Sequence, residues 1–384
     1  MLDKLSVGVV TDWLVSYAGA EKVIKEFIDI FPNSDLYSIV DFLSEKSRRE
    51  LSNKISETSF IQRLPRAKSN YQMYLPLMPH AVEQFDISKH DIILSSSHAV
   101  AKGVLTGPDQ LHISYVHSPI RYAWDLQHQY LREAKLSKGI KGMLARYLLH
   151  KIRMWDYRTA NGVDHFIANS KFISRRIKKV YGRESDVIYP PVDIDRFSLC
   201  ETKDNYYVTA SRMVPYKRMD LIVEAFSKMP EKKLIVIGSG SEMHKIKSKA
   251  TSNVNILGYQ SDEVLLELMQ NAKAFVFAAE EDFGITPVEA QACGTPVIAY
   301  GKGGTLETIR PYGVEKPTGL FFDKQNVNSI VEAVNQFERI SDYMEPSFCR
   351  GNALKFSTPR FKNEISTYIQ DKWDLFNEKK KITY

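Results

Sequence analysis

The chain has 384 residues and a mass of 44.0 kDa, more than one hydrophobic core usually supports, so we expect two domains. Hydrophobic residues make up 43% and charged residues 26%, which excludes disordered and fibrous architectures. The net charge is +6, and segment 131–155 alone carries that sum, with seven basic residues against one acid. A local basic patch therefore needs an explanation, whereas a generally basic protein does not.

The cysteines and the N-terminal segment indicate where the protein works. Cys200, Cys293 and Cys349 are widely separated and form no CxxC pair, so we expect neither a disulfide framework nor a structural zinc site. This pattern fits a reducing compartment. No apolar segment is long enough for a signal peptide or a membrane span, and we expect a cytosolic protein.

Short apolar runs rich in β-branched residues alternate with helical patterns along the chain. In the first half we expect strands at 5–10, 36–40, 91–95, 112–116, 165–168 and 186–189. In the second half we expect them at 206–210, 234–237, 254–257, 274–278 and 296–300. Continuous apolar runs without alternation are typical of parallel strands buried on both faces.

Helical patterns fill the intervals between these strands. Segments 20–28 and 264–272 each carry one apolar stripe at helical spacing. Strand–helix alternation in both halves predicts two doubly wound α/β domains, at 1–188 and 189–359, joined near Pro190 and Pro191. We expect a helix at about 360–384 to pack back on the first domain. Two such domains facing each other would form a cleft for one ligand.

The segment 280–290 has the strongest functional pattern. It follows a predicted buried strand and opens a predicted helix, with Thr286 as N-cap and Pro287 as first helical residue. Gly284 lets backbone N–H groups approach a phosphate at a helix N-terminus. Glu281 is expected in the loop and Glu289 one turn into the helix. Structural alternatives exist, since Thr286 and Glu289 also spell a capping box and a loop carboxylate is often only solvated.

This segment resembles the E-x7-E signature of family-4 retaining glycosyltransferases, which have the two-domain GT-B fold. The residues that match are Glu281, Phe283, Gly284, Ile285, Glu289 and Ala290, followed by 294–297. Further matches follow in order over nearly the whole chain. The resemblance implies that Glu281 contacts hydroxyls of the donor sugar and that Glu289 holds the ribose.

Other matches extend the donor site. Gly19 resembles the family's N-terminal glycine loop, which touches the donor diphosphate, although Ala18 stands where the family usually has a second glycine. Arg212 and Lys217 resemble the cations that bind the two phosphates, and such cations stabilise the charge that grows on the leaving diphosphate. The alternatives are a simple helix entry for Gly19 and a surface charge pair for the two cations.

Weaker matches complete the set. Gly238 and Gly258 resemble loops that line the nucleotide base and ribose, although isolated glycine pairs also form ordinary turns. His117, at the end of a predicted strand, resembles the family's active-site histidine beside the transferred sugar. The histidines His98, His112 and His128 have no comparable pattern, and we interpret them as structural. Asp193-Ile194-Asp195 spells a D-x-D metal motif of another fold, but we interpret it as a turn and expect no metal.

The resemblance also suggests a mechanism and a donor. The family retains anomeric configuration, by a front-face transfer in which the leaving phosphate helps to deprotonate the acceptor hydroxyl. Segments 74–79 and 95–104 resemble bacterial mannosyltransferases that build O-antigen or capsule from GDP-mannose. A UDP-hexose donor stays open as an alternative.

The basic segment suggests where the acceptor lies. Its cations are Arg132, Lys135, Lys138, Lys141, Arg146, Lys151 and Arg153. Apolar residues interleave with them at roughly helical spacing, a pattern that binds anionic membranes, and segment 60–68 is a second candidate. We therefore predict a polyprenyl-diphosphate-linked glycan acceptor and peripheral association with the inner face of the plasma membrane, where other polysaccharide-assembly enzymes are candidate partners. The alternative is a solvated helix face.

Three competing functions are compatible with parts of this pattern. A sugar-nucleotide 2-epimerase also uses two Rossmann-like domains, but it needs neither the E-x7-E spacing nor the Arg212 and Lys217 pair. A membrane-associated scaffold would explain the basic segment and leave the donor motifs unexplained. Nucleic-acid binding is disfavoured, because the basic residues cluster without a recognisable binding module.

Overall fold

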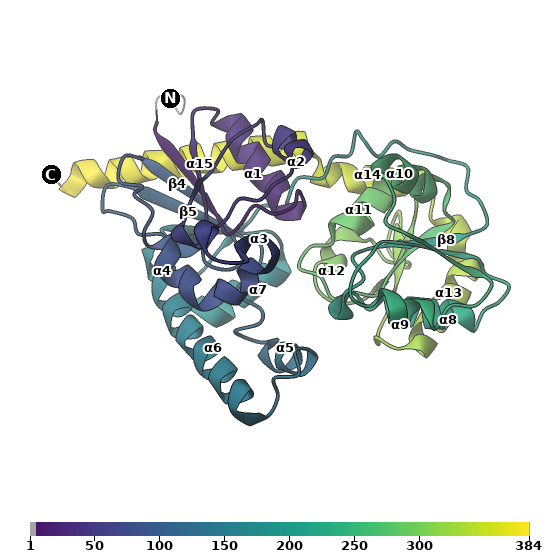
Figure 1. Cartoon of the computed structure of the whole chain (residues 1–384). Coiled ribbons are helices and arrows are strands. Elements are labelled where there is room, and N and C mark those ends of the chain that lie inside the picture. The colour runs from purple at the N-terminus through teal and green to yellow at the C-terminus, as the bar shows by residue number, and fades with distance from the viewer. Residues whose placement is uncertain (1–4, 384) are drawn as a thin grey trace. The chain divides into compact units, whose positions relative to one another are not determined.

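The structure is a computed structural model that describes residues 5–383. The chain divides into two compact units (Figure 1), one running to Pro190 and resuming at Phe361, the other spanning Pro191–Arg360. The domain boundaries expected from the sequence, after 188 and after 359, lie within two residues of these. Cys200, Cys293 and Cys349 are all free thiols.

The first unit is built on a seven-stranded parallel sheet with the order β3-β2-β1-β4-β5-β6-β7. Its strands are β1 (Val7–Thr11), β2 (Asp35–Ser38), β3 (Glu57–Thr58), β4 (Ile92–Ser97), β5 (Leu111–Val116), β6 (His165–Ala168) and β7 (Asp186–Val187). The strands β1, β4 and β5 are buried along their whole length, as expected for central strands of a parallel sheet covered on both faces. The order reverses between β1 and β4, and such a switch point opens a crevice at the carboxyl ends of the two strands.

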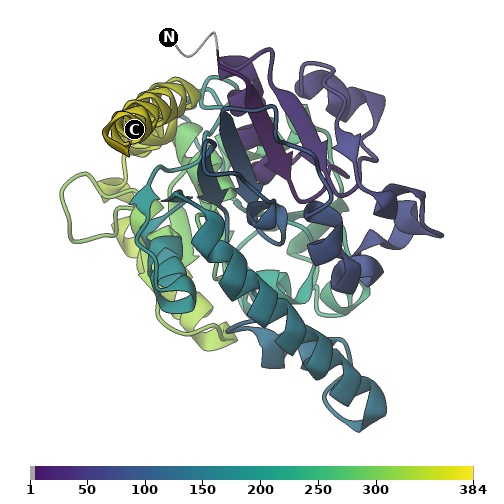
Figure 2. The same cartoon turned by 90° about the vertical axis from the view of Figure 1, so that its left-hand side faces the viewer.

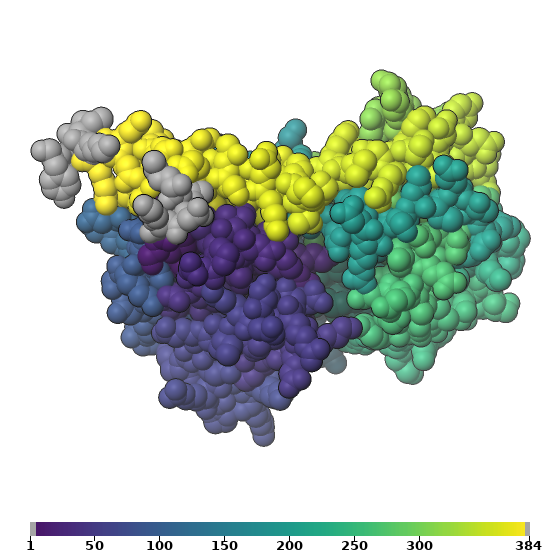
Figure 3. Space-filling view, turned by 90° about the horizontal axis from the view of Figure 1, so that it is seen from above, coloured from purple at the N-terminus to yellow at the C-terminus, as the bar shows by residue number. Residues whose placement is uncertain are grey.

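Helices cover both faces of this sheet. They are α1 (Gly19–Ile30), α2 (Glu45–Glu50), α3 (Ala67–Asn70), α4 (Met78–Val82), α5 (Gln127–Glu133), α6 (Gly139–Thr159), α7 (Lys171–Tyr181) and α15 (Thr358–Thr383). The last of these returns to the first unit, where Phe361, Ile365, Ile369 and Trp373 share a buried cluster with Phe27 of α1. Figure 3 shows α15 lying along the N-terminal elements. A spacing of four residues keeps its apolar side chains on one helix face.

The long helix α6 is tied to the first unit at its C-terminal end and extends away from the sheet at its other end (Figures 1 and 2). The tie is a buried ion pair between Lys102 Nζ and Asp156 Oδ1 at 2.8 Å. Trp124 Nε1 donates to Asp156 Oδ2 at 2.7 Å, and the Tyr181 hydroxyl donates to the same oxygen at 3.0 Å. Because both charges are neutralised and hydrogen bonded, their burial is tolerated.

The second unit repeats the same architecture with a six-stranded parallel sheet of order β10-β9-β8-β11-β12-β13. Its strands are β8 (Tyr207–Ala210), β9 (Leu234–Ile237), β10 (Val254–Gly258), β11 (Ala274–Phe277), β12 (Val297–Tyr300) and β13 (Gly319–Phe322). Its helices are α8 (Met219–Ser227), α9 (Met243–Lys247), α10 (Asp262–Asn271), α11 (Ile285–Ala292), α12 (Thr305–Thr308), α13 (Val327–Ile340) and α14 (Pro346–Ala353). Here the order reverses between β8 and β11.

These two sheets confirm the prediction of two doubly wound α/β domains. All the strands expected from apolar runs are present, with ends shifted by at most two residues. The sequence analysis missed the edge strands β3 and β13. β3 has two residues, and the four-residue run GLFF of β13 begins with a glycine, so neither stands out from a loop.

Candidate donor-binding site and its relatives

The donor motifs gather at the switch point of the second unit. Arg212 follows β8, and Glu281 follows β11, the neighbouring strand. Lys217, from the short helix after β8, forms an ion pair with Glu281, and both side chains are mostly buried. The pair therefore joins the two loops that diverge from the switch point, which is where α/β sheets bind ligands.

Arg212 lies beside this pair with its guanidinium exposed. Its Nη2 donates to the Tyr216 hydroxyl at 3.3 Å, and the Lys217 ammonium lies 5.3 Å from the Tyr216 ring centroid. Tyr216 thus contacts both cations and holds them on one side of the loop. An exposed guanidinium presents a planar set of donors that matches phosphate oxygens.

The glycine loop at Gly303 and Gly304 packs against the backbone of Glu281. Gly304 donates its backbone N–H to the Glu281 carbonyl oxygen at 2.8 Å. At Gly303, where φ is +79°, a Cβ atom would lie 2.4 Å from that same oxygen. The loop between β12 and α12 therefore fits only without a side chain at this position, and it fixes the backbone that carries Glu281.

The N-terminus of α11 differs from the prediction. Gly284 is the N-cap in a left-handed conformation, and the helix begins at Ile285, so Thr286 and Pro287 lie inside the first turn. The predicted Thr286 cap and its capping box with Glu289 were therefore wrong. Glycine adopts the left-handed conformation without strain, and this helix begins without a side-chain cap. Glu289 lies one turn into α11, as predicted, and is buried.

Of the remaining donor-motif residues, Phe283 lies in the core of the unit and two glycines lie at the carboxyl end of its sheet. Phe283 is buried against Phe356, with ring centroids 5.4 Å apart, so its side chain belongs to the core of the unit. Ile285 is partly exposed. Gly238 and Gly258 follow β9 and end β10, and the Gly238 N–H donates to the Gly258 carbonyl at 2.8 Å. These two glycines thus lie in adjacent turns at the carboxyl end of the sheet.

The first unit places His117 directly after β5. Its Nε2 is hydrogen bonded with Ser96 Oγ at 2.8 Å, and Asn169 Nδ2 donates to its backbone carbonyl at 3.0 Å. Burial lowers the pKa of His117 to about 3, with a smaller contribution from His98. The ring is therefore neutral near pH 7 and can orient a hydroxyl but carries no charge. Gly19, the other motif residue here, is the first residue of α1.

A carboxylate that the sequence analysis missed organises this end of the sheet. Asp12, fully buried after β1, accepts four backbone N–H bonds of 2.5 to 2.9 Å from the consecutive residues 98–101. Its Oδ2 also lies 3.0 Å from His98 Nδ1. An aspartate that directly ends an apolar strand is the signal that could have revealed it. His112 is different, because it is fully buried and hydrogen bonded with Ser95.

The predicted membrane-contacting cations lie on α5, α6 and the turn between them. Arg132, Lys135, Lys138, Lys141 and Lys151 are exposed, and Arg146 is partly buried, with its guanidinium donating to the Ser137 carbonyl. Large apolar side chains are exposed among them, namely Ile140, Met143, Leu144 and Tyr147. Ile140 is 81% exposed, so the patch is not the hidden face of a packed helix. No helix among residues 5–383 is both long and apolar enough to cross a bilayer.

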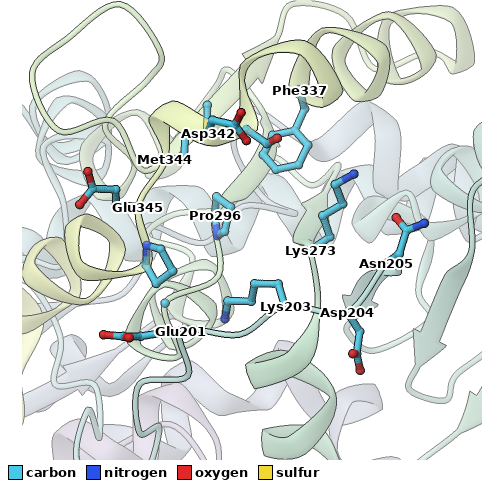
Figure 4. Close-up of a pocket in the computed structure, with 13 residues that line it drawn as sticks. Glu201, Lys203, Asp204, Asn205, Lys273, Pro296, Phe337, Asp342, Met344 and Glu345 are labelled. Atoms are coloured by element: carbon cyan, nitrogen blue, oxygen red, sulfur yellow. The ribbon is translucent and has the colours of Figure 1, made fainter.

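Two other features are separate from the donor motifs. The D-x-D segment forms a turn, in which Asp193 Oδ1 accepts the Arg196 N–H at 3.3 Å. The second unit has a hollow of about 610 Å³ at the amino ends of its strands, opposite the donor motifs. Lys273 and Pro296, which directly precede β11 and β12, help to line it (Figure 4). Its lysines are used structurally, since Lys203 Nζ donates to the Gln270 and Cys293 carbonyls. We therefore do not place the donor there.

Comparison with protein families agrees with the positions of these motifs. Residues 192–346, nearly all of the second unit, match the family described as "Glycosyl transferases group 1". Residues 19–196 match "Glycosyltransferase Family 4". Together the two matches span residues 19–346 and agree with the two-domain GT-B architecture. The Lys217–Glu281 pair, Arg212 and Glu289 all lie within the matched part of the second unit.

Two curated relatives are similar to about half of this chain. A "GDP-mannose-dependent monoacylated alpha-(1-6)-phosphatidylinositol monomannoside mannosyltransferase" of Corynebacterium glutamicum is 28% identical over 201 residues, 44% of this chain and 51% of the relative. A "D-inositol 3-phosphate glycosyltransferase" of Mycobacterium leprae is 28% identical over 211 residues, 48% of each chain. The chain therefore spans about half the length of the curated relatives that it matches.

Solved structures show the same fold over almost the whole chain. Anabaena HepE in complex with UDP matches with a TM-score of 0.70 and 16% identity, covering 96% of this chain and 100% of HepE. A sucrose-phosphate synthase from Thermosynechococcus elongatus matches with a TM-score of 0.72 and 15% identity, covering 96% and 100%. These likenesses establish the GT-B fold of the chain.

The glycine loop behind Glu281 generates a stability prediction. We expect Gly303→Ala to destabilise the protein by about 3 kcal/mol, because it adds a clash with the Glu281 carbonyl to the left-handed strain. Gly313→Ala is the matched control: φ is +98° there, and a Cβ would meet no atom within 4 Å. Its cost should be about 1 kcal/mol. Urea denaturation of both variants measures the difference, and equal costs would contradict the support that we assign to this loop.

Proposed function

We propose that this glycosyltransferase moves mannose from GDP-mannose to a lipid-linked glycan, with retention of configuration, in the synthesis of a bacterial surface polysaccharide such as O-antigen. The observation that carries the proposal is the Lys217–Glu281 pair beside the exposed Arg212, at the switch point of the second unit. A similar relative is named as GDP-mannose-dependent and as acting on a lipid, which supports both the donor and the kind of acceptor.

The geometry suggests a separate role for each of these three residues. An ammonium group has three N–H donors, so Lys217 can keep Glu281 in place and still donate to a phosphate oxygen. Glu281 is then held where its second oxygen can accept from a sugar hydroxyl. Arg212 adds a second cation for the diphosphate, whose charge grows as its bond to the anomeric carbon breaks.

In this mechanism the acceptor oxygen bonds to the anomeric carbon on the face that the diphosphate leaves. The acceptor proton passes to the departing phosphate oxygen, so that no enzyme carboxylate has to form a covalent intermediate. Glu289 holds the ribose from α11, and the neutral His117 orients the transferred sugar. Gly19 approaches the diphosphate with its backbone.

Thermal shift and transfer assays test the donor site. Saturating GDP or GDP-mannose should raise the melting temperature by a few degrees, since about 2.7 kcal/mol is gained at 100 times Kd, whereas UDP should have little effect.

Lys217→Ala should abolish this shift and lower transfer by about 100-fold, through the loss of one prepositioned cation. Lys228→Ala, an exposed lysine after α8, is the matched control. Full activity of a folded Lys217→Ala protein, or a shift by UDP alone, would contradict the assignment.

We also propose that the exposed end of α6 contacts the membrane that holds the acceptor. Basic residues attract anionic headgroups, and exposed apolar residues such as Ile140 and Met143 can enter the interface between headgroups and chains. The buried Lys102–Asp156 pair holds the C-terminal end of the same helix to the first unit.

Flotation with anionic liposomes tests this contact. Replacing Lys135, Lys138, Lys141 and Lys151 by glutamine should release the protein, because each basic residue near such a surface contributes about 1 kcal/mol. The matched control replaces the exposed lysines Lys228, Lys247, Lys316 and Lys324 of the second unit. Equal flotation of both variants would contradict the proposed contact.

A further inference from the structure

The loop that follows His117 is attached to the first unit by side chains. Residues 118–126 connect His117 to α5, and their backbone turns on itself, since the Ala123 and Trp124 N–H groups both donate to the Ile120 carbonyl, at 3.0 and 3.1 Å. Such local bonds shape the loop but do not fix its place beside the sheet. That place depends on contacts between the loop and its neighbours.

Two residues of the long helix α6 make these contacts. The Trp124 indole N–H donates to Asp156 Oδ2 at 2.7 Å, and Arg153 Nη1 donates to the Ala123 carbonyl at 2.7 Å. The same nitrogen of Arg153 donates to Gln127 Oε1, at the start of α5. Residues three positions apart lie on one face of a helix, so both contacts reach the same loop. Arg153, one of the cations of the basic segment, is therefore used inside the unit.

The burial of Asp156 does not require the Trp124 contact. Lys102 neutralises the fully buried carboxylate, and the Tyr181 hydroxyl donates to its Oδ2 at 3.0 Å. With these two partners the charge is already paired and hydrogen bonded. The bond from Trp124 is an addition, and its consequence is that the loop is attached to a buried, rigid point.

The loop begins at the proposed reacting centre and runs past the switch point of the first unit. His117 directly precedes it, so a displaced loop would displace the His117 backbone. Burial raises the pKa of Tyr122, and the Asp12 and Asp156 carboxylates raise it further, so the Tyr122 hydroxyl lies within electrostatic reach of the end of β1 and of α6. A misplacement of about 1 Å at a reacting centre can cost about 100-fold in rate.

We propose that Asp156 and Arg153 are positioning residues for the reaction. By fixing the loop 118–126 from α6, they hold His117 where it orients the transferred sugar. Asp156 is buried and acts through Trp124, so the loss of this contact should slow the chemical step and leave nucleotide binding by the second unit unchanged. The inference rests on the proposed function, which gives His117 its role, and it adds the support that keeps His117 in place.

Trp124→Phe is the informative variant, because it removes the indole N–H and keeps an aromatic ring. The probe is GDP-[14C]mannose with the lipid extract of membranes from the bacterium that carries the gene. We expect kcat to fall about tenfold, as part of the effect of a misplaced reacting group, and KM for GDP-mannose to stay within about twofold. Arg153→Met should act in the same way, whereas Arg153→Lys, which keeps a donor for the Ala123 carbonyl, should recover part of the loss.

Trp155→Phe is the matched control. The Trp155 indole N–H donates to Glu83 Oε1 at 2.8 Å, so this variant loses the same kind of bond from α6 to a residue outside the loop. Both tryptophan variants should lower the midpoint of urea unfolding by similar amounts. Only Trp124→Phe should lower kcat, because a merely structural bond would affect stability and not turnover.

Three results would overturn the positioning role. They are an unchanged kcat in a folded Trp124→Phe protein, an equal fall of kcat in Trp155→Phe, and the loss of the thermal shift with GDP in Trp124→Phe. The donor assignment fails separately. If the wild type uses UDP-glucose and not GDP-mannose, only the proposed donor is wrong, and the kcat values of the variants are compared with UDP-glucose.

Discussion

Parallel pairing of two central strands determines where each half of this molecule can bind a ligand. In the second unit β8 pairs with β11, and the chain leaves their carboxyl ends in opposite directions along the sheet, toward β9 and toward β12. The ends of the two loops must separate there, and the Lys217–Glu281 pair bridges them. The first unit has the same relation between β1 and β4, bridged by Asp12 and the loop 98–101.

The two bridges differ in their chemistry. The bridge of the second unit brings two cations, Lys217 and Arg212, to one place, which suits a diphosphate. In the bridge of the first unit, backbone N–H groups and His98 satisfy the buried Asp12 carboxylate.

Patterns in the sequence predicted most of the fold, because buried parallel strands need continuous apolar runs whatever surrounds them. Edge strands such as β3 were missed, since two residues carry no periodicity. The helix start at Ile285 was also missed, because the prediction relied on a threonine cap, whereas this helix begins after a left-handed Gly284 without any side-chain cap. The buried Asp12 carboxylate was also missed, since its backbone partners at 98–101 lie 86 to 89 residues away in sequence. Contacts of that range are set by strand order, which spacing along the chain does not encode.

The central claim is that mannose leaves GDP for an acceptor hydroxyl and keeps its configuration. NMR of the products from GDP-[13C]mannose, incubated with the full chain with and without membrane lipid extract, tests it most directly. We predict an α-linked mannosyl product in the lipid phase only when extract is present, and an unchanged C2 configuration in the donor that remains. A C2 epimer formed from the donor alone, or a β-linked product, would contradict the account.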